Sequence, residues 1–315
     1  MVVVTVNDEE RLFAMPTSEW SPMTVDLSRW AGEEVTLGLG ASSAMVQVGS
    51  PRVVPTQSPG TNVLVYLVDT LRADHVGWLS SEASVTPNLD ALADDGVLFT
   101  QAFSTGSWTK PVIPTVLTGL GPLQHGVGLT GIADRLPLDI PTLADALGSA
   151  GYRVGSFSAS PMGSTLSGLE RGFDVAVPPS HWAGRLGPLG HPSAHQVHEE
   201  LLDWIDERPD QPWAAYAHVL EPHAWANPLY SGGSDTPYRA AVSDWDDAFG
   251  TLVHALSARG LLDDTLVVFL SDHGESFGEH GLTGHGTGLV PQQTHVPLMM
   301  WHAERLPGAV VHEPV

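Results

Sequence analysis

The chain contains no cysteine, only one lysine and no long apolar run. The lack of cysteine excludes disulfides, thiolate metal sites and any nucleophile made from cysteine, but it leaves the redox compartment open. Because no apolar run reaches the roughly 18 residues that a membrane span needs, the sequence predicts no transmembrane helix. The first residues, MVVVTVNDEERLFAMP, lack the basic and apolar segments of an export signal. We therefore expect a soluble chain whose location stays open, and an extracytoplasmic one if further residues precede Met1.

Cationic side chains are scarce throughout. Lysine and arginine total 13 residues against 36 aspartates and glutamates, which gives a net charge of −23. Such a chain is a poor partner for nucleic acid or anionic membranes, because phosphate groups attract proteins mainly through clustered cations. We expect neither as a partner, and an anionic substrate must meet a local positive site.

The 315 residues suffice for one large α/β domain and a small appendage. Residues 1–57 contain short alternating segments that predict a few antiparallel strands, which are too few to bury a core alone. They either pack on the main domain or are the remnant of a larger β-sandwich. The segment QSPGTN, residues 57–62, is the expected linker. Residues 58–315 are the expected main domain, and its abrupt end at Val315 predicts a truncated chain.

From Asn62 onward, apolar strands alternate with helical segments. NVLVYLV, WAAYAHV and TLVVFLS are nearly continuous apolar runs, which is typical of strands covered by helices on both faces. We therefore predict an α/β fold with a doubly wound, mostly parallel sheet flanked by helices.

Residues of metal-ligand type follow three of the predicted strands. Asp69 follows the first, Glu221 and His223 the second, and Asp272 and His273 the third. Ligands of open α/β sheets bind beyond the carboxyl ends of the strands, so we predict a shared metal or catalytic site there. A single such aspartate would more commonly cap a turn or helix, but three strand ends together favour the site.

A glycine-rich loop, HGESFGEHGLTGHGTG, follows Asp272. Its glycines allow backbone and imidazoles to approach a ligand closely. For His280 we expect an ordinary polar loop position, whereas for His285 a substrate contact and a loop position are equally open.

The segment GSWTKPVIPTVLTG contains the lone lysine, Lys110. Pro111 suits the first position of a helix, which would place Thr109 or Lys110 at the helix start. A helix N-terminus attracts anions, and Lys110 would add a full charge. The plainer alternatives are an N-cap role for Thr109 and a solvated side chain for Lys110.

These segments resemble the sulfatase family of the alkaline-phosphatase superfamily. Five pieces between residue 62 and about residue 300 stand in the family's order: NVLVYLVDTLRADHVG, TPNLDALADDGVLFTQAFS, TKPVIPTVLTG, HVLEPHAW and VVFLSDHGESFGEHGLTGHGTG. The resemblance implies that Asp69, Asp272 and His273 bind a metal ion. It also implies that Thr109 is the nucleophile and turns its oxygen toward the metal.

The resemblance further places His223 and His285 where the family has groups that contact the oxyanion or the leaving group. It does not separate their individual roles. Lys110 has no sure counterpart, and we count it as a catalytic candidate only because it could help to hold an anion. Arg72 follows the first metal strand, and we expect it to pair with nearby acids.

The sequence departs from the family at two places. True sulfatases start the nucleophile helix with Cys-x-Pro-x-Arg, whose cysteine becomes formylglycine, but here the segment is Thr109-Lys110-Pro111-Val112-Ile113. The formylglycine mechanism is therefore excluded. Thr70 replaces the second aspartate of the family's Asp-Asp pair, so one carboxylate ligand is lost.

The remaining ligands narrow the choice of metal. Imidazole at His273 and the loss of a carboxylate at Thr70 favour Mn²⁺ or Zn²⁺ over Ca²⁺, with Ca²⁺ and Mg²⁺ still open. We expect one ion, because only Glu221, His223 and His285 are left over for a second.

A threonine nucleophile is typical of superfamily members that act on phosphodiesters or transfer phosphoryl-linked groups. We therefore predict a metal-dependent hydrolase of phosphate or sulfate esters, of phosphodiester type, that forms a covalent intermediate on Thr109. The substrate would be a small molecule or a glycan- or envelope-derived ester, and the oligomeric state stays open. The alternatives are a sulfuric ester hydrolase, a phosphoryl-group transferase, and an inactive or truncated binding protein.

Overall fold

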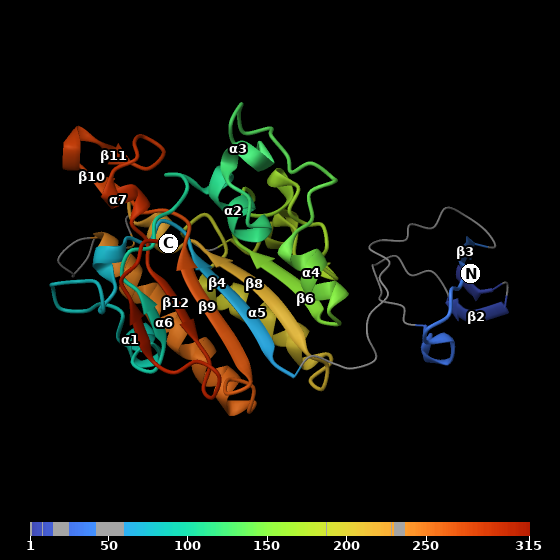
Figure 1. Ribbon diagram of the computed structural model, residues 1–315. Coiled ribbons are helices and arrows are strands. Elements are labelled where there is room, and N and C mark those ends of the chain that lie inside the picture. The colour runs from blue at the N-terminus through green and yellow to red at the C-terminus, as the bar shows by residue number, and fades with distance from the viewer. Residues whose placement is uncertain are drawn as a thin grey trace. The chain divides into compact units, whose positions relative to one another are not determined.

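Figure 1 shows the computed structural model of the chain, which describes residues 2–7, 9–14, 25–41, 60–186, 188–227, 229 and 237–315. The chain divides into two compact units, Met1–Thr56 and Gln57–Val315. In the described parts of the chain, no helix combines the length and the apolarity that a membrane crossing requires.

The first unit contains a small antiparallel sheet. Its strands are β1 (Val2–Val6), β2 (Glu9–Ala14) and β3 (Leu37–Ala41), in the order β2-β1-β3. A short 3-10 helix, η1 (Ser28–Trp30), precedes β3. The antiparallel strand expected in EEVTLGLG is thus present, whereas the segment expected at residues 44–54 and most of the linker lie outside the described residues. A β-sandwich origin for this unit stays a prediction.

The second unit is built on an eight-stranded sheet with the order β13-β5-β12-β9-β4-β8-β6-β7. Its strands are β4 (Asn62–Val68), β5 (Val97–Phe99), β6 (Arg153–Ser158), β7 (Val175–Ala176), β8 (Trp213–Val219), β9 (Thr265–Ser271), β12 (Leu298–Trp301) and β13 (Ala309–Val311). All neighbouring pairs are parallel except those made by β12, which runs antiparallel to β5 and β9. The predicted mostly parallel sheet is therefore confirmed.

Helices cover both faces of this sheet (Figure 1). They are α1 (Pro87–Ala93), α2 (Thr109–Thr118), α3 (Pro122–His125), α4 (Leu143–Ser149), α5 (Ala194–Asp206), α6 (Pro237–Ala258) and α7 (Pro291–Thr294). Along β4, Leu64, Tyr66 and Val68 pack with α1, α5 and α6. Val65 and Leu67 point to the opposite face and pack with α2 and α4. Strands buried in this way on both faces read as continuous apolar runs.

Short elements connect these layers. The 3-10 helices are η2 (Ala73–His75), η3 (Thr165–Ser167), η4 (Pro179–Trp182), η5 (Pro222–Ala224) and η7 (Glu279–Gly281). A two-stranded hairpin, β10 (Ser276–Phe277) and β11 (Thr283–Gly284), follows β9. It carries the chain from Asp272 to His285.

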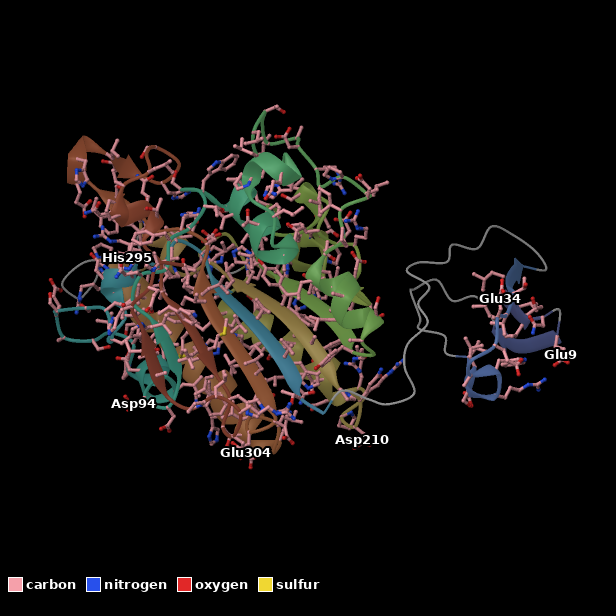
Figure 2. The ribbon with its side chains drawn as sticks, viewed as in Figure 1. Glu9, Glu34, Asp94, Asp210, His295 and Glu304 are labelled. Carbon is pink, nitrogen blue, oxygen red and sulfur yellow. The ribbon has the colours of Figure 1, made fainter. Side chains whose placement is uncertain are left out.

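The sheet's two ends differ in their chemistry. The labelled acids Asp94, Asp210 and Glu304 gather at the end where β4 and β8 begin (Figure 2), and all three are exposed. Exposed acids need no partner, because water solvates them. The buried Asp69 and Asp272 lie at the other end, directly after β4 and β9.

Candidate functional site

Two aspartates leave the sheet side by side. β4 and β9 are parallel neighbours in which Val68 lies opposite Ser271, so the next residues, Asp69 and Asp272, emerge together. Both are buried, with 1% and 0% of their surface exposed. Two buried carboxylates that lie side by side repel each other unless a cation neutralises their charge. The prediction that residues following different strands come together at one edge of the sheet is thus confirmed for Asp69 and Asp272.

Each carboxylate has one oxygen fixed by local hydrogen bonds. Asp272 Oδ1 accepts the backbone N–H groups of Thr70 at 3.1 Å and His273 at 2.9 Å. The Thr70 hydroxyl donates to Asp69 Oδ1 at 2.7 Å. Asp272 Oδ2, in contrast, is buried without a hydrogen-bond partner. Buried carboxylate oxygens are normally paired, so this one points to a missing cation.

Thr70 adopts an unusual backbone conformation to make these contacts. Its φ is +67°, in the left-handed region that β-branched residues seldom enter. The position that lacks the family's second carboxylate therefore still orients the two aspartates, through its amide and its hydroxyl.

His273 turns a lone pair toward the carboxylates. Its Nδ1 lies 2.9 Å from the carbonyl oxygen of Gly274, which can only accept, so Nδ1 carries the proton. In the neutral ring Nε2 is then an acceptor. It lies 3.6 Å from Asp69 Oδ1 and 3.3 Å from Asp272 Oδ2. This is the arrangement of a histidine metal ligand whose orientation is fixed from outside.

The pKa values of the two aspartates are shifted in opposite directions. Burial alone would raise the pKa of Asp69, but the hydrogen bond from His218 and the nearby histidines outweigh it and lower that pKa. Burial and the charge of Asp69 raise the pKa of Asp272. The pair therefore favours a single negative charge unless a cation is bound.

Thr109 reaches this cluster from the start of α2. Its hydroxyl oxygen lies 3.3 Å from His273 Nε2 and 3.4 Å from Asp69 Oδ2, and the residue is 6% exposed. The helix begins at Thr109, so the prediction that Thr109 or Lys110 stands at the helix start is confirmed. Pro111 is its third residue rather than its first, and the N-cap is the extended Trp108 rather than Thr109, so these two predictions are wrong. Pro111 is still accommodated, because the first helical N–H groups lack partners inside the helix.

His285 and His223 lie beside the cluster. The ring of His285 is 4.6 Å from that of His273 and 5.1 Å from that of His223, measured between centroids. His285 Nδ1 lies 3.1 Å from a carboxylate oxygen of Glu275. Burial alone would lower the pKa of His285, but the hydrogen bond and charge of Glu275 outweigh it and raise that pKa. His223 is exposed.

The loop that carries His285 is fixed at both ends. Gly286 donates its N–H to the Ser107 carbonyl, which joins the loop to the residues before Thr109. Gln293 of α7 donates to Ser276 Oγ and to the Gly284 carbonyl at 2.8 and 3.1 Å. Sequence segments far apart are therefore tied together around one site.

Lys110 is not solvated, contrary to one of its two predicted roles. The side chain is completely buried, and Nζ donates to the Leu166 carbonyl at 3.1 Å and to Ser167 Oγ at 3.3 Å. Burial lowers its pKa. These contacts link α2 to η3. A role of Lys110 in holding an anion stays a prediction.

Arg72 pairs with nearby acids, as predicted. Its guanidinium lies 2.7 Å from Asp74 and 2.8 Å from Glu279, and it donates to the Glu275 carbonyl at 3.0 Å. These contacts fasten the hairpin region to the end of β4. His280 is exposed in a turn with φ of +57°, which agrees with the polar loop position expected for it.

Glu221 does not join the cluster, contrary to its choice as a strand-end ligand. One of its oxygens accepts the backbone N–H of Ala194 at the start of α5, and the other is buried without a partner. A carboxylate suits a helix N-terminus. The second metal set imagined from Glu221, His223 and His285 is not formed among the described residues, where the one group of three potential ligands is Asp69, His218 and Asp272.

His218 is the site residue that the sequence prediction missed. It lies inside β8, opposite Leu67 of β4, and is completely buried. Its Nε2 is 3.1 Å from Asp69 Oδ2. The signal was present, because a histidine in an otherwise apolar strand needs a polar partner in the interior. The predicted site residues all follow strands or lie in loops and helices, whereas His218 lies within a strand.

The cluster fits a divalent metal ion. One ligand atom each from Asp69, His218 and Asp272 lie within 4.8 Å of one another, and His273 Nε2 faces both carboxylates. Mixed carboxylate and imidazole donors suit Mn²⁺ or Zn²⁺. Asp272 Oδ2, which has no hydrogen-bond partner in the described part of the chain, is available to bind such an ion.

Together, fold and site define a class of protein: an α/β sheet protein with buried carboxylates and imidazoles beyond its strand ends and a threonine hydroxyl beside them at a helix start. Residues 61–315 match the family model described as Sulfatase, and the chain therefore belongs to the sulfatase family.

Two curated relatives illustrate the match. The chain is 28% identical over 309 residues to arylsulfatase A of Homo sapiens, covering 80% of this chain and 61% of the relative. It is 26% identical over 262 residues to the low-salt glycan biosynthesis sulfotransferase Agl7 of Haloferax volcanii, covering 75% of this chain and 53% of the relative. The chain thus spans less than two thirds of either relative.

The fold also matches solved structures. Phosphonate monoester hydrolase of Agrobacterium radiobacter superimposes with a TM-score of 0.65 at 24% identity, over 80% of this chain and 70% of that one. This likeness supports the alkaline-phosphatase-like sheet.

Proposed function

We propose that this chain is the catalytic part of a metal-dependent hydrolase that cleaves phosphodiesters, or sulfate esters, through a covalent intermediate on Thr109. The observation that supports this proposal most strongly is the position of the Thr109 hydroxyl, 3.3 Å from His273 Nε2 and 3.4 Å from Asp69 Oδ2. A nucleophile beside a potential metal ligand set matches what metal activation of a hydroxyl requires.

Asp69, Asp272 and His273 would hold the ion. When bound, it would act as a Lewis acid that lowers the pKa of the Thr109 hydroxyl and attracts the ester oxygens. Thr109, after losing its proton to solvent, forms a bond from Oγ to phosphorus or sulfur while the bond to the leaving oxygen breaks. Its place at the start of α2 puts the helix dipole behind the growing negative charge.

The leaving oxygen needs a proton, and His285 or His223 can supply it. Glu275 keeps His285 oriented and raises its pKa, which suits a proton donor. Water then attacks phosphorus or sulfur while the bond to Thr109 Oγ breaks, the histidine takes up a proton of that water, and Oγ regains a proton from solvent. His223 is the second candidate, since its ring contacts that of His285.

The charge of the site favours an ester with one negative charge. Lys110 and Arg72, the cations next to site residues in the sequence, are tied to other partners. The ion and the histidines must therefore supply the positive charge. Phosphodiesters and sulfate monoesters carry one charge, whereas a phosphate monoester carries about 1.5 to 2 at neutral pH. Because the family resemblance links a threonine at this position to phosphodiester substrates, we place phosphodiesters before sulfate esters.

The substitution Thr109→Ala tests this function, with Thr109→Ser as its matched control. We expect Ala to lower kcat on a bis-aryl phosphodiester by about 10³-fold or more, and Ser to retain activity within about tenfold. Aryl phosphate and aryl sulfate are assayed in parallel with Mn²⁺ or Zn²⁺. Activity of folded Thr109→Ala equal to wild type would refute the covalent route. Turnover of aryl sulfate alone would reverse the substrate order.

A transferase is the second candidate, because one curated relative is named a sulfotransferase. The same Thr109 intermediate would then be attacked by an alcohol in place of water. Product analysis in glycerol separates the two: a transferase yields mainly the glycerol ester, and a hydrolase mainly the free acid. An inactive binding protein would bind metal and substrate analogue but release no product in either assay.

A further inference from the structure

Two imidazoles flank Asp69, and their outer nitrogens have opposite partners. His273 Nδ1 faces the Gly274 carbonyl, an acceptor, at 2.9 Å. His218 Nδ1 faces the Tyr216 hydroxyl at 3.0 Å. A hydroxyl can donate as well as accept, so the two rings need not carry their protons on the same nitrogen.

The hydroxyl of Tyr216 determines which ring nitrogen of His218 carries the proton. Tyr216 is 2% exposed, and its hydroxyl has one hydrogen-bond partner in the described structure, His218 Nδ1. Burial, together with the charges of Asp272 and Asp69, raises the pKa of Tyr216 well above its usual value, so the phenol keeps its proton. A buried O–H group must donate to something, and Nδ1 is the acceptor within reach.

The proton of a neutral His218 then lies on Nε2. That nitrogen is 3.1 Å from Asp69 Oδ2 and can donate to it. The opposite arrangement would leave the Tyr216 O–H unpaired, a cost of about 1–3 kcal/mol, and would set a nitrogen lone pair against carboxylate lone pairs. The two rings are thus complementary: His273 offers a lone pair to the cluster and His218 offers an N–H.

The surroundings hold the His218 ring in this orientation. A Cβ on Gly163 would lie 2.4 Å from His218 Nδ1, so the chain passes directly against the ring and only glycine fits there. Ser158 Oγ, 3.4 Å from Nδ1, donates its proton to the Ser160 carbonyl at 3.0 Å and so does not compete with Tyr216 as donor.

We propose that His218 is a positioning residue: the chain Tyr216 O–H to His218 Nδ1, and His218 Nε2–H to Asp69 Oδ2, orients the Asp69 carboxylate for the metal, and His218 is not itself a ligand. The inference rests on the metal site of the proposed function. Hydrogen bonds to a ligating carboxylate from outside the ligand set fix its orientation. The set of three potential ligands thus contains one residue that holds another.

The first test is spectroscopic. Long-range ¹H–¹⁵N spectra of the wild-type chain labelled at histidine are recorded with and without Zn²⁺, and the His218 signal is assigned by its loss in His218→Gln. We expect the Nε2–H tautomer in both states. Tyr216→Phe should shift this ring toward a mixture of tautomers, which loss of packing alone would not cause. An unprotonated, zinc-bound Nε2 in the wild type would overturn the proposal.

The second test measures metal affinity by competition titration in His218→Leu and His218→Gln. Leu has no donor, whereas Gln places an N–H near the position of Nε2. We expect Leu to bind Zn²⁺ about 10 to 100-fold more weakly and Gln to recover most of the loss. With Co²⁺, absorption maxima should stay unchanged in both variants, because the ligand set is the same.

The outcomes separate the proposals. Wild-type protein that binds no metal overturns the metal site and this inference together. Wild-type affinity in a folded His218→Leu variant, or a changed Co²⁺ spectrum in His218→Gln, overturns this inference alone. If His218→Leu fails to fold, the tautomer of the wild-type ring decides.

Discussion

The site consists of two regions that are built in different ways. The metal cluster of Asp69, Asp272, His273 and His218 comes from strands or the residues that follow them, and its side chains are at most 1% exposed. The histidine pair, His223 and His285, lies on connecting segments, and His223 is exposed. The cluster is anchored by backbone amides and by neighbouring side chains, whereas the pair is held by Glu275, which contacts Nδ1 of His285.

Because the cluster and the histidine pair are built differently, we expect them to have different functions. Buried charges tolerate little displacement, because each lost partner leaves a desolvated charge behind. We therefore expect the cluster to be rigid and selective for the ion that it binds. Groups on loops tolerate change, and such positions commonly contact substrates. We expect substitutions in the cluster to weaken metal binding, and substitutions in the pair to change turnover without changing metal affinity.

The largest effect is expected for Asp272→Asn. This substitution removes one of two adjacent buried carboxylates, and with it the unpartnered oxygen that faces the cluster. Zn²⁺ or Mn²⁺ affinity should fall by more than the roughly 100-fold that loss of an outer hydrogen-bond partner typically causes. The metal-free protein should gain about 1–3 kcal/mol of unfolding free energy, because the repulsion is relieved.

Chemical denaturation with and without metal measures both effects at once. Asp94→Asn, an exposed acid far along the strand direction from the cluster, is the matched control and should change neither quantity. A metal-induced rise in stability that is the same in Asp272→Asn as in wild type would contradict a metal site at these strand ends.

The next effect is expected for His285→Gln. As a proton donor to the leaving oxygen, His285 should contribute about 10² to 10³-fold in kcat. The loss should shrink for aryl leaving groups of low pKa, which depart without a proton, while metal affinity stays at the wild-type value. His280 is an exposed histidine of the same loop, so His280→Gln serves as the control and should change neither kcat nor metal affinity. An equal loss for all leaving groups would show that His285 does not donate the proton.

His223→Gln sharpens the same comparison. If His285 protonates the leaving oxygen, His223 is left to contact the other ester oxygens, and its loss should be about tenfold and independent of the leaving group. Rates are measured on a series of aryl phosphodiesters. A leaving-group dependence in His223→Gln and none in His285→Gln would exchange the two roles.

The sequence predicted the fold and most of the cluster because both follow from local patterns. Continuous apolar runs identified β4, β8 and β9, and polar residues after β4 and β9 identified Asp69, Asp272 and His273. Parallel neighbours bring their ends together, so the spacing along the chain was no obstacle.

The errors lie where a side chain's partner is set by tertiary contacts. A histidine in the apolar run WAAYAHV signals a buried polar partner, but nothing in that run shows that β8 lies next to β4, so the contact of His218 with Asp69 was missed. Glu221 follows β8 as Asp69 follows β4, yet its partner is the start of α5. A solvated side chain was one of the two roles predicted for Lys110, and it is wrong because η3, some 56 residues later, covers this side chain.

The smallest effect is expected for Glu221→Gln, which compares a buried acid outside the cluster with those inside it. Burial raises the pKa of Glu221 to about 7, although backbone hydrogen bonds at Ala194 and neighbouring positions oppose the shift. In the unfolded chain this group ionises near pH 4.5. Between these values the folded state keeps a proton that the unfolded state has lost, so stability falls as pH rises from about 4.5 to 7.

Glutamine is neutral at every pH and keeps a carbonyl oxygen for the Ala194 N–H. The variant should therefore match wild type at pH 4 and exceed it by about 1–3 kcal/mol at pH 8, with unchanged metal affinity. Urea denaturation across this range, on the metal-free and the metal-bound protein, measures the difference. A Glu221→Gln variant less stable than wild type at pH 8, or one that binds metal more weakly, would show that this carboxylate is charged in the fold and belongs with the cluster after all.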